Sequence, residues 1–98
     1  MSRDVIISKL KALRPSLEGE GVLHIAIFGS RARGDEKPTS DLDILLDVDP
    51  AYKFSILDLV GIEEMARKVT GFETNAFMRR SLDHGFANSI RNDVVEVF

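Results

Sequence analysis

The sequence predicts an α/β fold in which helices pack on one mixed sheet of three to four strands, in the order α-β-α-β-α-β-α. Two segments carry apolar residues at helical spacing, and two short apolar runs rich in β-branched residues lie between polar or glycine-containing stretches. Such alternation of helices and strands is typical of the α/β class. The length of 98 residues predicts one domain, over residues 1–98.

The charge composition limits the classes of molecule that are expected to bind this protein. Lys and Arg number 13 and Asp and Glu number 16, so the formal net charge is −3. This balance argues against a long nucleic acid as partner, because such binding depends largely on cations that pair with phosphates. A homo-oligomer is left open.

Cysteine is absent, so the core has no disulfides, which fits a reducing compartment. The N-terminal stretch carries charges throughout, unlike a signal peptide. No segment has the ~20 apolar residues of a membrane span. We therefore expect a cytoplasmic protein without a membrane partner.

The first helix is expected to begin after Ser2 as N-cap, with Asp4 in the first turn, where the helix dipole favours an acid. Pro15 lies inside the apolar pattern, so the helix is predicted to end or kink near Arg14. Its apolar positions are Val5, Ile6, Leu10, Leu13 and Leu17.

Residues 22–28 (VLHIAIF) are nearly all apolar, which predicts a strand buried on both faces. The polar residues 29–40 predict a loop, with room for a short helix from Ser30. Residues 41–49 (DLDILLDVD) predict the second strand. Strand alternation places Asp41 and Asp43 on one of its faces, with Leu45.

A long helix is predicted over residues 55–70, capped by its first residue, Ser55. Two oppositely charged i,i+4 pairs are predicted on its exposed side: Glu63 with Arg67, and Glu64 with Lys68. Its apolar stripe is predicted to comprise Ile56, Leu59, Val60, Ile62, Met65, Ala66 and Val69.

Gly71 ends that helix, and residues 72–78 (FETNAFM) predict a third strand. Ser81 is a candidate cap for a last helix, and residues 94–98 predict a short terminal strand. The apolar residues of the last helix are Leu82, Phe86 and Ile90.

The segment with the most chemistry runs from Gly29 to Asp43 (GSRARGDEKPTSDLD). The carboxylates of Asp41 and Asp43 project from the same strand face, and such pairs hold Mg²⁺ together with substrate phosphates. For Ser30 to share a site with them, the first two strands must run antiparallel. The long helix then crosses over to a third strand, expected to be parallel to the second.

The turn at Gly29 and Ser30 is small enough for a polyphosphate to approach the backbone, and helix N-terminal amides attract anions. Arg31 and Arg33 suit phosphates or a partner carboxylate, and the sequence leaves that choice open. A P-loop is excluded, because acids replace its Lys and Ser/Thr: Asp35 and Glu36 follow Gly34.

Taken together, Gly29-Ser30, Arg31, Arg33-Gly34 and Ser40-Asp41-x-Asp43 after an apolar strand resemble the signature of the DNA polymerase β superfamily of nucleotidyltransferases, and its minimal nucleotidyltransferase (MNT) branch in particular. The resemblance covers nearly the whole chain. It implies the minimal nucleotidyltransferase fold.

The resemblance also implies an activity. Gly29, Ser30, Arg31, Arg33 and Ser40 would bind a nucleoside triphosphate. Catalytic Asp41 and Asp43 would bind two Mg²⁺ ions, and AMP would pass from ATP to a hydroxyl. Members of this branch are commonly encoded beside an all-helical HEPN-domain protein. That pair resembles a toxin–antitoxin system in which the MNT protein adds AMP to its partner.

One departure from the family stands in the third strand. Where the family has a third carboxylate, this chain has Asn75, which carries no charge and cannot act as a base. Glu73, two residues earlier, is a substitute by strand alternation. The alternative reading is a catalytically degenerate antitoxin that binds nucleotide or only its partner. Which nucleotide and which acceptor hydroxyl are used stays open.

Other polar residues have structural interpretations. His24 is expected in the core or on a sheet face, and Arg79-Arg80 in a solvated turn. Tyr52 and Phe54 are expected to cover the core, with base stacking as the alternative. Asp47 and Asp49 are expected near solvent at the strand end rather than as metal ligands.

Overall fold

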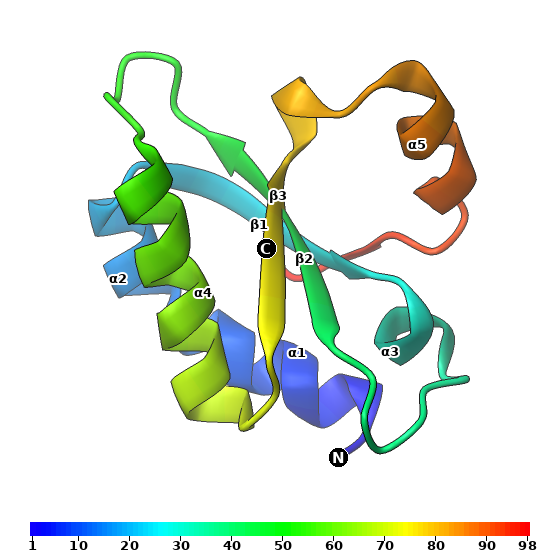
Figure 1. The fold of residues 1–98 in the computed structure, drawn as a ribbon. Helices are drawn as coiled ribbons and strands as arrows, with labels where there is room; N and C mark the ends of the chain where they lie inside the picture. The colour runs from blue at the N-terminus through cyan, green and yellow to red at the C-terminus, as the bar shows by residue number, and fades with distance from the viewer.

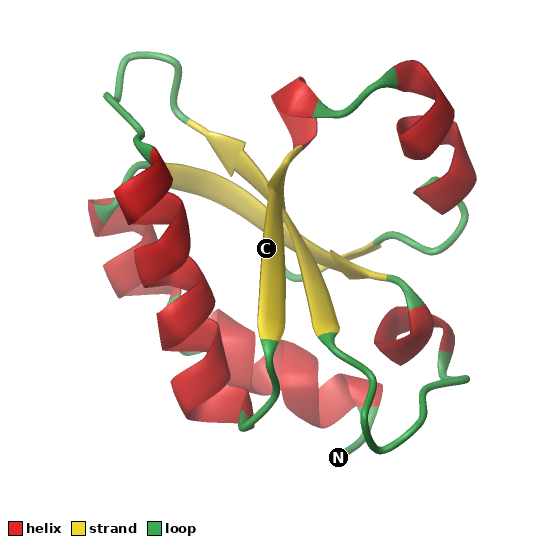
Figure 2. Cartoon of the chain, in the orientation of Figure 1, coloured by secondary structure: helices red, strands yellow, loops and turns green.

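The computed structural model describes all 98 residues. Its sheet has four strands in the order β3-β2-β1-β4, with helices on both faces (Figures 1 and 2). The strands are β1 (Val22–Phe28), β2 (Leu42–Val48), β3 (Thr74–Met78) and β4 (Val95–Glu96). The helices are α1 (Arg3–Lys11), α2 (Arg14–Gly19), α3 (Ser30–Arg33), α4 (Ile56–Thr70) and α5 (His84–Ile90), with a 3₁₀ turn at Arg79–Ser81.

The predicted strand directions are confirmed. β1 pairs antiparallel with β2, and β2 pairs parallel with β3 across the crossover made by α4. β4 pairs antiparallel with β1 and completes the sheet. Asp43 lies opposite Phe28 on one side and Asn75 on the other. The C-terminal end of β1 therefore meets the N-terminal ends of β2 and β3.

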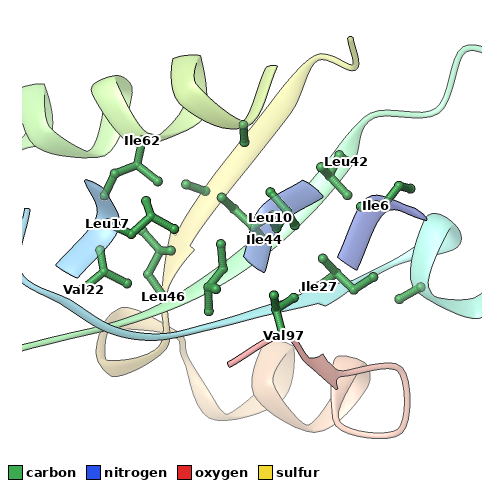
Figure 3. Close-up of a cluster of buried hydrophobic side chains, with 14 of the residues drawn as sticks. Ile6, Leu10, Leu17, Val22, Ile27, Leu42, Ile44, Leu46, Ile62 and Val97 are labelled. Atoms are coloured by element: carbon green, nitrogen blue, oxygen red, sulfur yellow. The ribbon is translucent and has the colours of Figure 1, made fainter. Parts of the chain in front are cut away.

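The two faces of the sheet bury two separate clusters, as strand alternation predicted. Leu42, Ile44 and Leu46 face the larger cluster, under α1, α2 and α4 (Figure 3). Leu45 faces the smaller one, under α5. The side chains of Asp41 and Asp43 share the face of Leu45, so they lie away from the main core.

The break in the first helix is also confirmed. The hydroxyl of Ser2 accepts from the Val5 backbone N–H and caps α1, which ends at Lys11. Pro15 then lies in the first turn of α2, where a missing N–H leaves no intrahelical bond unmade.

Several local predictions for α4 were wrong. Only Ile62, Ala66 and Thr70 are fully buried, and Ile56 and Val60 point into solvent. The carboxylate of Glu63 does not pair with Arg67, but accepts a 2.8 Å hydrogen bond from the backbone of Ala76 in β3. Arg67 instead binds Glu64, one turn earlier. The rest of the protein therefore covers a narrower stripe of α4 than the apolar pattern indicated.

The C-terminal third differs from prediction in its details. Asp83, not Ser81, caps α5 by accepting from the Phe86 N–H. Arg79 is not a free turn residue, since it forms ion pairs with Asp47 and Glu96. These partners come from β2 and β4, too distant in sequence for local rules to connect them.

Two further residues correct the prediction of a fully buried first strand. Leu23 and His24 are exposed, beside a shift in the β1–β2 register between Val22 and His24. Phe54 packs against the main core as expected, whereas Tyr52 is 37% exposed and lies against Gly21. None of the helices combines the length and the apolar composition needed to cross a membrane.

Candidate functional site

Asp41, Asp43 and Asn75 meet at one edge of the sheet. β2 and β3 run parallel and start side by side, so Asn75 lies directly across from Asp43. The Asn75 Nδ2 amide donates to Asp41 Oδ2 at 3.1 Å and to Asp43 Oδ1 at 3.2 Å. The residue that departs from the family pattern therefore holds the carboxylate pair together.

Gly29 closes the site from β1. Its φ of +78° lies in the region that favours glycine. A Cβ at this position would come 2.6 Å from Asp43 Oδ2. Both the backbone conformation and the space beside the carboxylate therefore require glycine here.

The charge of Asp43 is poorly compensated. Burial raises the pKa of this carboxyl, and the charge of Asp41 raises it further. The hydrogen bond from Asn75 and the charge of Arg33 act in the opposite direction but do not cancel the rise. A cation added at this site would lower the pKa and stabilise the ionised pair.

The oxygen donors fit Mg²⁺. Magnesium prefers oxygen ligands and takes one or two carboxylates plus substrate phosphates. Two carboxylates converge on the partly positive amino group of Asn75, which marks where their negative potential overlaps. Rotation of the Asn75 side-chain amide by half a turn would bring its oxygen Oδ1 to the position that Nδ2 now occupies. Asp41, Asp43 and Asn75 together therefore offer an all-oxygen site.

Ser30 begins α3 immediately after Gly29. The Gly29 carbonyl accepts from the N–H groups of Ala32 and Arg33, which closes the first turn. Ser30 is half-buried and is the first residue of α3. The small turn at Gly29 and Ser30 thus lies next to Asp43.

Arg31 occupies a different environment from Arg33. Arg31 is 3% exposed, and its guanidinium carbon lies 3.6 Å from the ring centroid of Phe72. Its Nε donates to the Ser40 carbonyl at 2.9 Å, and Nη2 donates to the Pro38 carbonyl. This arginine fastens the loop 34–41, which carries Ser40 into the site region, to the body of the protein.

Arg33 lies near the carboxylates but is already paired. Its Nε donates to Asp35, and Nη1 donates to Asp93 at 2.9 Å. Sequence reasoning missed Asp93, because it is 60 residues from Arg33 and lies in no motif. Asp93 ties the loop after β1 to the segment after α5.

Glu73 is not brought to the pair. It precedes β3 and is exposed, and no group of three or more acidic, His or Cys side chains is close enough to share an ion. Its backbone carbonyl accepts from Leu42 and so starts the β2–β3 ladder. The third position beside the carboxylates belongs to Asn75.

An aromatic layer packs on the sheet face that carries the carboxylates. Phe28 lies opposite Asp43, and its ring stacks edge-on against Phe77 with centroids 5.4 Å apart. Phe86 from α5 completes the group at 6.0 Å from Phe28 and 5.7 Å from Phe77. This layer supports the sheet face beyond the carboxylates.

Comparison with known proteins identifies relatives of this chain. A family model described as a nucleotidyltransferase domain matches residues 6–97. The chain is 34% identical over 93 residues to the protein adenylyltransferase MntA of Thermococcus cleftensis, covering 95% of this chain and 89% of the relative.

Two solved structures share the fold. One is a toxin–antitoxin with AMP-PNP, with a TM-score of 0.73, 15% identity and coverage of 92% of this chain and 72% of the other. The second is the tri-AMPylated HEPN toxin of Shewanella oneidensis in complex with MNT antitoxin, with a TM-score of 0.70 and 13% identity. It covers 98% of this chain and 71% of the other.

Proposed function

The chain belongs to the nucleotidyltransferase domain family, and from this premise we propose that it transfers AMP from ATP to a hydroxyl group of a HEPN-type partner protein. The observation that carries this proposal is the contact between two sequence-distant parts of the motif. Gly29 abuts Asp43, so the turn that we expect to receive phosphate lies beside the carboxylate pair. The relative named a protein adenylyltransferase supports the reaction class.

Asp41, Asp43 and the Asn75 amide oxygen would hold Mg²⁺. The metal would supply positive charge against the negative charge that develops between the α-phosphate and the leaving pyrophosphate, and we propose two ions, as in other two-metal sites. Two carboxylates and a neutral amide compensate less of the positive charge of the metal ions than three carboxylates would. Nucleotide phosphates therefore complete the site electrostatically.

The turn at Gly29 and Ser30 would receive the triphosphate. Gly29 would let phosphate oxygens approach the backbone, and the hydroxyl of Ser30 would donate to one of them. Arg33, beside Asp43, would contribute positive potential, and Arg31 would act indirectly by holding the Ser40 carbonyl.

In the transfer, the acceptor oxygen forms a bond to the α-phosphorus, and the bond from that phosphorus to the pyrophosphate oxygen breaks. The hydroxyl proton leaves to a site carboxylate or to solvent, because the Asn75 amide cannot accept it. We assign the acceptor side of the site to the partner protein, which supplies the hydroxyl.

One observation favours a second candidate, a degenerate antitoxin. The Asn75 amino group satisfies an oxygen of both carboxylates by itself, which stabilises the pair without any metal. In that case the protein binds nucleotide or covers its partner, and transfers nothing.

One experiment separates the two candidates. The protein is incubated with its HEPN-type partner, labelled ATP and Mg²⁺, alongside Asp41→Ala and Asn75→Asp. Label on the partner that is lost with Asp41→Ala supports transfer. An unlabelled partner with the native chain, but a labelled one with Asn75→Asp, supports the degenerate antitoxin.

A matched control keeps this test specific. Asp49 lies just beyond the other end of β2, where its carboxylate accepts only from the nearby Ala51 N–H. Asp49→Asn removes one acid from the same segment and should leave labelling unchanged. Equal loss with Asp41→Ala and Asp49→Asn would show that general charge, not the site, governs labelling.

A further inference from the structure

The N-terminal half of α4 is apolar on the side turned away from the sheet, although nothing in the chain covers it. Ile56, Leu57 and Val60 are 70%, 79% and 52% exposed, within little more than one helical turn. Together with Gly61 we name these residues the outer α4 face. Other exposed apolar side chains, such as Val5 and Leu23, come from separate elements. Clustered apolar exposure marks interaction surfaces, whereas single exposed residues do not.

Gly61 is the second unusual feature of this face. It lies inside a 15-residue helix, where glycine costs about 1 kcal/mol relative to alanine. Its φ is not positive, and a Cβ added to it would meet nothing within 4 Å. The fold of the single chain therefore gives no reason for glycine here. A close approach by another backbone or a large side chain does.

The outer α4 face is complementary to itself. The most exposed large apolar side chain, Leu57, lies one turn before the residue without a side chain, Gly61. In a two-fold arrangement of antiparallel helices, the leucine of each copy fits over the glycine of the other. Two-fold interfaces require such reciprocity, in which residue i meets j and j meets i.

The charges around this face match the same arrangement. Lys53 is exposed just before the N-terminus of α4, and Glu64, which also pairs with Arg67 of its own helix, is exposed beyond Gly61 in the C-terminal half. Antiparallel pairing brings the lysine end of one helix toward the glutamate of the other, and opposes the two helix dipoles favourably. A parallel arrangement would put like charges together.

We propose that the outer α4 face is the interface of a two-fold symmetric dimer of this chain. The dimer leaves the candidate site free, because α4 covers the sheet face opposite to Asp41 and Asp43 (Figure 1). One helix from each copy buries less than the area of a standard stable interface. The dissociation constant is therefore expected on the order of 10–100 µM.

Sedimentation equilibrium of the full chain tests the proposal. The average mass should rise from 10.9 kDa toward twice that value as concentration increases through this range. Leu57→Glu should lower the association constant at least tenfold, whereas Val5→Glu, a matched change on α1, should not alter it. A chain that stays monomeric up to about 1 mM, about tenfold above the expected constant, would overturn the proposal and leave this face to a different protein.

Two further measurements separate the interface from folding and define its register. Gly61→Ala should raise the unfolding midpoint, through helix propensity, while weakening association. Because the chain has no cysteine, Leu57→Cys and Gly61→Cys chains can be mixed under oxidation. The mixture should form more disulfide-linked dimer than either variant alone. Equal or stronger linkage within one variant would refute the reciprocal register.

Discussion

Gly29 and Asp43 are in such close contact that a Cβ atom on the glycine would lie 2.6 Å from the aspartate Oδ2. The contact joins the end of β1 to the start of β2, two segments whose neighbouring residues Phe28 and Asp43 pair across the sheet. The glycine of the motif is thus explained by the carboxylate beside it as well as by access for a phosphate.

Gly29→Ala should destabilise the protein more than substitution of a glycine in an ordinary left-handed turn. Gly29 has φ +78° and ψ −161°, a backbone region essentially restricted to glycine that costs roughly 1–3 kcal/mol for a residue with a Cβ, and the contact with Asp43 must also shift. Gly34→Ala is the comparison, since Gly34 has φ +88° and ψ 12° in the left-handed α region and no atom lies within 4 Å of the added Cβ. Urea unfolding should show the larger loss of stability for Gly29→Ala. Equal losses would contradict this account of Gly29.

Ionisation of Asp43 should make folding less favourable as pH rises. Its pKa is raised in the folded chain, so between the unfolded value of about 3.9 and the raised value the folded state binds more protons. Stability from this group is present below that window and is lost above it. With EDTA present, Asp43→Asn should raise the unfolding temperature at pH 7 more than at pH 3.5. Asp49→Asn serves as comparison, and a gain independent of pH would contradict this account.

Asn75→Asp should lower the stability of the metal-free protein and raise its affinity for metal. The substitution removes the donor that bridges Asp41 and Asp43 and places a third negative charge beside them. Without metal the unfolding free energy should fall by about 1–3 kcal/mol. Added Mg²⁺ should restore more stability to this variant than to the native chain. Asn75→Ala, which loses the donor without gaining charge, should fall similarly but show no such recovery.

Arg31→Lys should loosen the loop before β2. A lysine has no planar fork to bind the Ser40 and Pro38 carbonyls together and stacks less well on Phe72. We expect a loss of about 1–3 kcal/mol in unfolding free energy and faster amide exchange in residues 34–41. Arg80→Lys, at an exposed position, should change neither. A normal stability together with lost nucleotide binding would instead place Arg31 in direct contact with phosphate.

Interactions between residues close in the sequence were predicted better than interactions between distant segments. Ser2 and Ser55 cap their helices as predicted, because a cap depends on residues within one turn. Ser81 was the wrong cap for the last helix, since Asp83 offers the same chemistry two residues later and local rules did not separate them. The Arg33–Asp93 and Arg79–Glu96 pairs join distant segments, and no spacing in the sequence indicates them.

The sequence alone determined the order of the elements, the two faces of β2 and the grouping of Gly29, Ser30, Asp41 and Asp43. These follow from alternation, from capping and from glycine, which act over a few residues. Only the tertiary structure decided that the Asn75 amide bridges both carboxylates, that Arg31 is buried, and that Leu57 and Val60 face solvent. Each of these depends on which surfaces meet when strands and helices pack, and that packing depends on interactions between segments distant in the sequence.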